Sequence, residues 1–249
     1  MRQSLRLYLP ELSLQTQQVI LPSHLAHHVV TVLRGKPGDS VTLFNGHDGY
    51  LYTGTIEKIV KKNVTIHIDQ YNQGPNTESK LSIHLIQAVG KKDKFDWVVQ
   101  KATELGVKKI TPIITDYTDY KLPAEKHAKK QHHWQEIAVQ AAQQCQRLYI
   151  PTIDSIIPLT KWWEGGLQPN AEKLMMHPGQ QTFKQVIENK VDILNWQLFV
   201  GPEGGFSPRE CQQAQDYGVV SVGLGPRILR TETAPIAMMS ALQMSQGDF

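Results

Sequence analysis

Two glycine-rich segments near the C-terminal end of the chain carry side chains that could do chemistry. The first is GPEGGFS at 201–207, and the second is LGPRILRTET at 224–233. Glycines permit tight turns and let a ligand approach the backbone closely. Glutamates such as Glu203 and Glu232 can accept a proton, and an arginine such as Arg230 can stabilise developing negative charge. We therefore interpret the two segments as one ligand site with possible acid–base chemistry.

The runs around both segments predict that they are loops at one edge of a sheet. Leu198–Val200 and Val219–Val222 read as short buried strands, and helix-like runs begin at Pro208 and Ala234. In parallel α/β sheets, the loops that follow the strands meet at the edge where ligands bind. A plain strand-to-helix turn is the alternative for the first segment alone, but the charges crowded into the second favour a ligand site.

Helix-start signals follow each loop. Ser207 with Glu210 predicts a capping box, with Pro208 as the first helical residue. Thr231 or Thr233 is the expected cap of the apolar helix that follows the second loop. The glycine spacing fits neither a Walker loop nor the dinucleotide-binding pattern G-x-G-x-x-G, so a phosphate cradle is the weaker interpretation.

Other chemical motifs are weak. His177 follows the strand-like run Leu174–Met176 and is expected near the same sheet edge. The remaining histidines lack a metal-binding pattern such as H-E-x-x-H, and we expect no metal. Cys145 and Cys211 are too few for a disulfide framework and are expected to be reduced thiols.

Composition limits the classes of protein to which the chain can belong. It has 249 residues, 40% of them hydrophobic, and a formal net charge of +3. No segment has the length and apolarity of a membrane span, and no signal peptide precedes the first strand-like run, so we expect a cytoplasmic protein. The net charge alone does not identify a nucleic-acid binder, although lysines cluster at 91–94 and 121–130.

The patterning along the chain predicts two domains. Alternating apolar residues from Leu5 to Ile68, with a turn at 45–49, predict a small β-barrel. Residues 71–79 are polar and turn-rich, as a linker would be. Strand-like and helix-like runs alternate beyond it, and Gly106 suits the C-terminal end of the first helix. This second part predicts an α/β fold with a parallel sheet.

At these residues the chain resembles the 16S ribosomal RNA uridine-N3 methyltransferases of the SPOUT, or trefoil-knotted, superfamily. The two loops match the family's cofactor loops, and Lys101–Val107, Ile137–Gln144 and His28–Arg34 fall where the family has similar segments. The sequence departs from the family at Gln140 and Gln143, where glutamate is frequent, and near Thr118, where an Arg-Ser pair is frequent.

The resemblance implies the fold, cofactor and partners. We expect a PUA-like β-barrel RNA-binding domain at residues 1–72 and a trefoil-knotted SPOUT α/β methyltransferase domain at 78–249. S-adenosyl-L-methionine is the implied cofactor, and 16S ribosomal RNA of the small subunit is the implied substrate. The implied assembly is a homodimer in which each subunit completes the site of its partner.

Specific residues are assigned to three roles. The candidate catalytic residues are Arg230, Glu203 and Glu232. The residues expected to bind the cofactor are Met176, His177, Phe199, Val200, Gly201, Pro202, Glu203, Gly204, Gly205, Leu224, Gly225, Ile228, Leu229, Arg230, Thr231, Thr233 and Ala234. The residues expected to bind RNA are Arg2, Arg6, Arg34, Lys36, Lys91 and Lys94.

Two other functions stay open from the residues. One is an RNA-binding protein that keeps the fold without catalysis. The other is a methyltransferase that acts on transfer RNA or on a ribose 2′-hydroxyl. The cofactor loops cannot name the acceptor atom, because they would contact the cofactor and not the acceptor.

Overall fold

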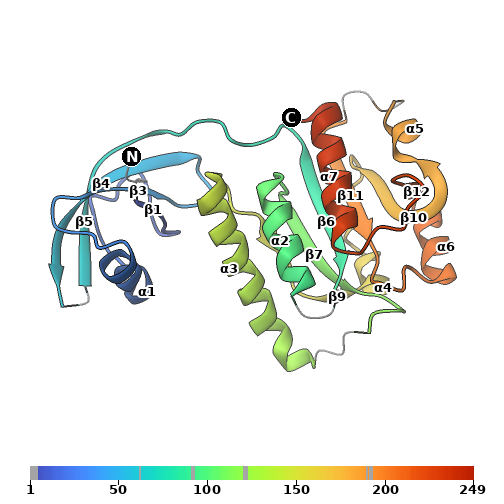
Figure 1. Cartoon of the computed structure of the whole chain (residues 1–249), viewed down its shortest axis with the longest axis horizontal. Helices are drawn as coiled ribbons and strands as arrows, with labels where there is room; N and C mark the ends of the chain where they lie inside the picture. The colour runs from blue at the N-terminus through green and yellow to red at the C-terminus, as the bar shows by residue number, and fades with distance from the viewer. Residues whose placement is uncertain (1–4, 62, 91–92, 120–122, 189, 191–192) are drawn as a thin grey trace. The chain divides into compact units, whose positions relative to one another are not determined.

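The structure is a computed structural model that describes residues 5–61, 63–90, 93–119, 123–188, 190 and 193–249. The chain divides into two compact units. Unit 1 comprises Met1–Glu78 and Ala142–Ile150, and unit 2 comprises Ser79–Ala141 and Pro151–Phe249. Each unit has its own sheet (Figure 1).

Unit 1 contains one five-stranded sheet in the order β1-β3-β4-β5-β2. Its elements are β1 (Leu5–Tyr8), β2 (Gln18–Ile20), α1 (Ser23–His27), the π-helical turn η1 (His28–Val32), β3 (Ser40–Phe44), β4 (Tyr50–Val60) and β5 (Asn63–Gln73). Strands β3 and β4 pair antiparallel across the expected turn, where Gly46 and Gly49 adopt positive φ. Alternate apolar residues of β3, β4 and β5, including Leu43, Tyr52 and Ile66, pack into one core.

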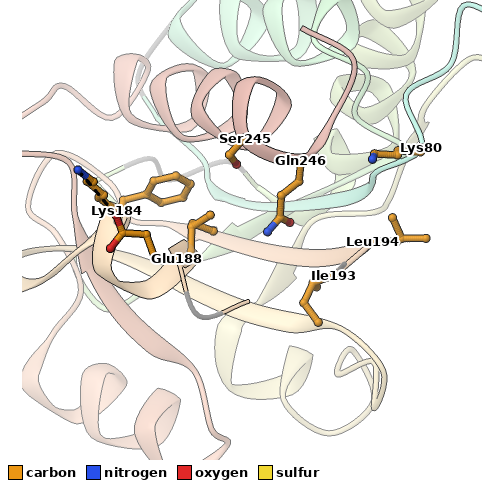
Figure 2. A pocket seen from close by; sticks show the side chains of 9 residues that line it. Lys80, Lys184, Glu188, Ile193, Leu194, Ser245 and Gln246 are labelled. Carbon is orange, nitrogen blue, oxygen red and sulfur yellow. Dashed lines mark ion pairs between the residues drawn. The ribbon is translucent and has the colours of Figure 1, made fainter. Parts of the chain in front are cut away.

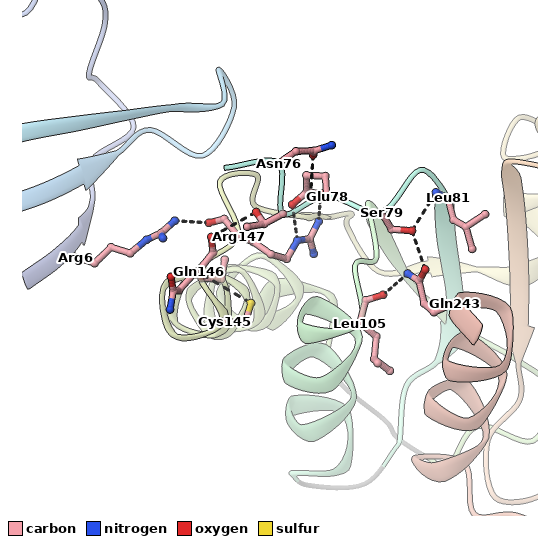
Figure 3. A network of polar contacts seen from close by, with 12 residues as sticks. Arg6, Asn76, Glu78, Ser79, Leu81, Leu105, Cys145, Gln146, Arg147 and Gln243 are labelled. Atoms are coloured by element: carbon pink, nitrogen blue, oxygen red, sulfur yellow. Dashed lines mark hydrogen bonds and ion pairs between the residues drawn. The ribbon is translucent and has the colours of Figure 1, made fainter. Parts of the chain in front are cut away.

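A later segment of the chain completes unit 1. Arg147 lies in the loop after α3 (His127–Cys145) and forms a two-armed ion pair with Glu78, at 2.9 and 2.7 Å (Figure 3). Arg6 donates a hydrogen bond of 2.8 Å to the carbonyl of Arg147, and Gln143 donates one of 3.1 Å to the carbonyl of Arg6. These contacts hold residues 142–150 in the unit.

Unit 2 contains a seven-stranded sheet in which every described strand pair is parallel. The strand order is β12-β10-β11-β6-β7-β8, and β9 also pairs with β7. The strands are β6 (Ser82–Ala88), β7 (Lys109–Ile114), β8 (Thr152–Ile153), β9 (Ile157–Pro158), β10 (Glu172–Thr182), β11 (Asn195–Val200) and β12 (Val220–Gly223). The predicted parallel α/β fold is therefore confirmed.

The helices of unit 2 cover the sheet. They are α2 (Lys94–Glu104), the 3₁₀ turn η2 (Ala124–Lys126), α3, α4 (Leu159–Trp162), α5 (Phe183–Glu188), α6 (Pro208–Asp216) and α7 (Thr233–Gln246). The chain leaves the edge strand β12 and returns as α7, which lies beside α2 and contacts β11 (Figure 1). The loop before α7 is thereby drawn back to the strands at the centre of the sheet.

Local helix signals are mostly as expected. Ser207 and Glu210 form both hydrogen bonds of the capping box at the start of α6. Gly106 follows α2 with a φ of +84°. The expected threonine cap of α7 is wrong, because Glu232 occupies the N-cap position without a side-chain cap bond. The Thr231 hydroxyl donates to the carbonyl of Gly201 instead.

A buried polar network crosses the sheet of unit 2. The Thr111 hydroxyl donates to Asp154 at 2.5 Å, so it must accept the 2.7 Å hydrogen bond from Nε2 of His84. The amide of Gln197 lies 3.4 Å from the other ring nitrogen, as a donor would. Burial lowers the pKa of His84 from 6.5 to about 4, with a smaller contribution from Lys109. This histidine is therefore neutral in the fold.

Candidate functional site

A cavity of about 550 Å³ lies at the C-terminal ends of β11 and β12 and beside the middle of β10. The residues that line it are Lys94, Met176, His177, Val200, Gly201, Pro202, Glu203, Gly204, Gly205, Phe206, Val222, Gly223, Leu224, Gly225, Arg227, Ile228, Leu229, Arg230, Thr231 and Ala234. Beside it the register of β10 against β12 shifts after Met176. The volume is within the range of small-molecule sites, and the place is the one expected for an open parallel sheet.

A hydrogen-bonded chain joins the two loops. The Thr231 hydroxyl donates to the Gly201 carbonyl at 2.6 Å and accepts from Nε2 of Gln87 at 3.1 Å. All three groups are buried. Because an unpaired buried carbonyl is unfavourable, this chain fixes the second loop against the first. The hydrogen-bonded chain thus ties the end of β6 to the loop after β11 and to the loop before α7.

Different physical constraints favour glycine at different positions of the two loops. Gly205 and Gly225 adopt φ values of +75° and +89°, which other residues rarely adopt. Gly204 has no such constraint, but a Cβ atom there would lie 3.1 Å from Cβ of Tyr117. Gly204 therefore allows close packing of the first loop on the segment after β7.

The first loop is also held by its own helix. The Ser207 hydroxyl and the Arg209 guanidinium both donate to Asp116, at 2.5 and 2.6 Å. The carboxylate of Glu210 accepts from the backbone N–H of Asp116 at 2.9 Å. Arg209, and then Ser207, holds the pKa of Asp116 below its usual value. The turn after β7 and the start of α6 are consequently joined by side-chain hydrogen bonds.

The charged groups of the site converge on one lysine. Nζ of Lys94, at the start of α2, lies 2.7 Å from Oε1 of Glu203 and 3.6 Å from Oε2 of Glu232. Nη1 of Arg230 lies 3.9 Å from Oε1 of Glu232. The hydrogen bond to Glu203 raises the pKa of Lys94, so this lysine stays charged. A cation from α2 thus bridges the acidic residues of both loops.

The two glutamates differ in environment. Glu203 lines the cavity and its side chain is 43% exposed, whereas that of Glu232 is 17% exposed and lies outside the lining set. Oε2 of Glu232 is buried without a hydrogen bond among the described residues. Arg230 lines the cavity with a side chain that is 82% exposed. Of the catalytic candidates, Glu203 and Arg230 face the cavity.

The structure brings most of the expected cofactor residues to the cavity and leaves two outside it. Phe199 is fully buried and stacks on Trp163 at 5.1 Å, because neighbouring residues of β11 point to opposite faces. Thr233 is exposed on the first turn of α7. Sequence reasoning missed Phe206, Val222, Gly223 and Arg227, which flank the predicted residues.

The expected RNA-binding residues have different places. Lys94 lines the cavity, and Arg34 and Lys36 are exposed on unit 1. Arg6 is half-buried, with its guanidinium 4.5 Å from the ring centre of Phe44 and bonded to Arg147. Arg2 and Lys91 lie outside the described residues.

A second cavity in unit 2, of about 510 Å³, lies at the opposite edge of the sheet (Figure 2). Ile193 and Leu194, which precede β11, line it with Phe183 of α5 and Gln246 of α7. The glycine loops do not reach it, and the ligand edge of a parallel sheet is the other one. The first cavity is therefore the candidate site.

Two further features are absent from the part of the chain that the structure describes. Its helices include none long and apolar enough to cross a membrane. Its His, Cys, Asp and Glu side chains include no group of three or more that could hold a metal ion.

Comparisons with known proteins match this architecture along the whole chain. A family model described as an RNA methyltransferase domain matches residues 77–243, and one described as an RNA methyltransferase PUA domain matches residues 21–69. Ribosomal RNA small subunit methyltransferase E of Buchnera aphidicola (subspecies Schizaphis graminum) is 36% identical over 94% of both chains.

Two solved structures are similar as well. A methyltransferase of Legionella pneumophila in complex with S-adenosylmethionine has a TM-score of 0.91 and 38% identity, over 99% of this chain and 100% of that one. Ribosomal RNA small subunit methyltransferase E of Neisseria gonorrhoeae, bound to S-adenosylmethionine, has a TM-score of 0.87 and 34% identity, over 99% of both chains.

The chain therefore belongs to the RNA methyltransferase family, within the group of small-subunit ribosomal RNA methyltransferase E proteins. The SPOUT fold with a PUA-like domain, expected from the resemblance, is confirmed. S-adenosylmethionine as the cofactor is confirmed by the two structures that hold it.

The residues of the cavity fit this cofactor. Apolar side chains of Met176, Val200 and Leu229 can pack against an adenine ring, and the backbone of both loops is open to polar groups. Polar side chains of His177, Glu203 and Arg230 also line the cavity and can contact the polar groups of the cofactor. S-adenosylmethionine supplies an electrophilic methyl group on a sulfonium.

Proposed function

We propose that the protein methylates N3 of a uridine in 16S ribosomal RNA, with S-adenosylmethionine as methyl donor. The observation that carries this proposal is the cavity between the two glycine loops, with Glu203, Lys94 and Arg230 at its wall. The family membership and the names of the relatives support ribosomal RNA of the small subunit as the substrate. Uridine N3 as the acceptor atom rests on the resemblance of the chain as a whole to the uridine-N3 family, since the loops alone do not name the acceptor.

The backbone of both loops holds the cofactor in this proposal. The residues that bind it are those of the predicted set that line the cavity, together with Phe206 and Gly223. Methyl transfer is an in-line displacement, so precise positioning of donor and acceptor supplies much of the rate.

Uridine N3 carries a proton at neutral pH, and the site must remove it or stabilise the anion. Glu203 is the proton acceptor in our proposal, because it lines the cavity. Lys94 and Arg230 stabilise the negative charge that develops on the uracil ring. Glu232, which does not line the cavity, holds Lys94 in place through their ion pair.

Two alternative functions differ from the proposed one, either in the acceptor of the methyl group or in the absence of catalysis. Methylation of transfer RNA or of a ribose hydroxyl would use the same cofactor loops. An RNA-binding role without catalysis would leave the intact cofactor loops unused.

The assay is the transfer of labelled methyl from S-adenosylmethionine to small ribosomal subunits or to free 16S RNA, followed by digestion to nucleosides. We expect 3-methyluridine as the labelled product. A 2′-O-methylated nucleoside, or label in transfer RNA only, would overturn the acceptor assignment. Cofactor binding without any transfer would support the non-catalytic role.

The proposal includes a homodimer that acts in the cytoplasm, where ribosomal RNA is modified. Ile228 lines the cavity yet is 85% exposed, and burial by a second copy would remove this apolar surface from water. Sedimentation analysis should give twice the mass of the chain, and a monomer at all concentrations would contradict the dimer.

A further inference from the structure

Tyr117 is an exposed aromatic residue held rigidly beside the cavity. The residue is 49% exposed, although it lies in the middle of a well-anchored turn. The Thr118 hydroxyl accepts from the backbone N–H of Thr115 at 2.9 Å, and the two hydroxyls lie 2.8 Å apart. Asp116 ties the same turn to α6. The ring therefore projects from a fixed backbone.

The position of the ring is set by the first glycine loop. The site where Gly204 would carry a Cβ atom lies 3.1 Å from Cβ and 3.7 Å from Cγ of Tyr117. Gly204 lines the cavity, while Tyr117 does not. The ring thus lies against the loop that lines the cavity, and so next to the cavity itself.

The charges nearby fit a nucleic acid. Lys94, Arg227 and Arg230 line the same cavity as Gly204. Single-stranded nucleic acids are bound where exposed aromatic rings lie next to cations, because bases stack on the rings while phosphates contact the cations. A site that must admit a uracil ring also has to separate that base from its neighbours in the RNA.

We propose that Tyr117 is a stacking platform for a base of the substrate RNA next to the target uridine. It positions the RNA and does not take part in the methyl transfer. This inference rests on the proposed function, since it assigns an RNA contact to the same site.

The test compares substitutions that keep or remove the flat ring. Tyr117→Phe and Tyr117→Trp keep stacking, Tyr117→Leu keeps apolar bulk, and Tyr117→Ala removes both. The matched control is Tyr217→Ala, because Tyr217 is also a half-exposed tyrosine of unit 2, with 45% of the residue exposed. It does not line the cavity, and its ring stacks on that of Trp163. The substrate is the small ribosomal subunit from a strain without the gene for this protein.

Single-turnover methylation is measured as a function of subunit concentration. We expect Tyr117→Ala and Tyr117→Leu to raise the half-saturating concentration about tenfold, with a much smaller change in the rate at saturation. The Phe and Trp variants and the control should stay within about twofold of the parent. Calorimetry should give an unchanged affinity for S-adenosylmethionine in all of them.

Three results would overturn the inference. The first is a half-saturating subunit concentration in the Ala and Leu variants equal to that of the parent. The second is a Phe variant whose half-saturating concentration is as high as that of the Ala variant. The third is a dimer that Tyr117→Ala dissociates in sedimentation. The last would assign the ring to a second copy of the chain. A parent that fails to methylate the subunits would instead refute the proposed function, so the two failures are distinguishable.

Discussion

At the scale of single residues, Lys94 organises the charges of the site. Its ammonium joins Glu203 of the first loop to Glu232 of the second. From sequence it was expected to contact RNA phosphates, and the structure places it on the cavity wall, where that contact stays a prediction. The signal that could have shown this is its place at the start of a helix just after a strand, at the ligand edge of the sheet.

The roles assigned to the glutamates predict unequal effects. Glu203→Gln and Arg230→Ala should each lower the single-turnover methylation rate more than about tenfold at saturating cofactor and RNA. Glu232→Gln should have a smaller effect, because this carboxylate acts through Lys94. The glutamine variants keep the size of the side chain and remove only the charge. Rates within twofold of the parent in all three proteins would make these residues structural.

Because the pKa of buried His84 is lowered, we expect the protein to lose stability in acid. The pKa of this histidine is about 4 in the fold against 6.5 ordinarily. As the pH falls below about 6.5, the unfolded chain therefore binds a proton before the folded chain does. Denaturant titrations should show a free energy of unfolding that falls by about 3 kcal/mol between about pH 7 and 4 on this account. His84→Gln should flatten this slope, whereas His132→Gln, at an exposed position, should leave it unchanged.

At the scale of elements, the hydroxyl of Thr231 predicts coupling between the two loops. Thr231→Val keeps the shape of the side chain and leaves the buried Gly201 carbonyl without its donor. We expect about tenfold weaker binding of S-adenosylmethionine by calorimetry, and faster hydrogen exchange in both loops without cofactor. Thr233→Val, two residues further along the chain and exposed, is the control. Parental exchange rates in Thr231→Val would show that the loops are held by other contacts.

The elements around the site were largely predictable, because their signals are local. Ser207, Pro208 and Glu210 specify the start of α6 within four residues, and short apolar runs mark β11 and β12. The failure at Thr231 has a long-range cause, since its hydroxyl is taken by a carbonyl thirty residues earlier in the chain. Phe199 was assigned to the cavity because strand position alone does not say which face a side chain occupies.

At the scale of the whole molecule, the chain combines two compact units, each with its own sheet. The return of residues 142–150 to unit 1 has no local sequence signal, because it depends on the pairing of Arg147 with Glu78, far apart in the chain. Nor does periodicity indicate the strand order of unit 2. The knotted SPOUT class was available only through the resemblance of the loops to a known family.

Unit 1 predicts how the protein recruits RNA. Lys36→Ala and Arg34→Asn together should weaken binding of 16S RNA. The slope of the logarithm of the binding constant against the logarithm of the salt concentration should fall by the equivalent of about 1–2 phosphate contacts, with cofactor affinity unchanged. Asparagine suits position 34 because its φ is +53°. Arg6→Ala should instead lower the stability of unit 1, because this side chain is bonded to Arg147. A parental salt slope in the double variant would remove these residues from RNA recruitment.

The most direct test of the central claim is mass mapping of modified nucleosides in 16S ribosomal RNA, from cells with and without this gene. We predict that 3-methyluridine at one position is present in the parent, absent from the deletion strain, restored by the gene, and not restored by a copy that carries Glu203→Gln. An unchanged set of 16S modifications in the deletion strain, or the loss of a different methylated nucleoside, would contradict the account.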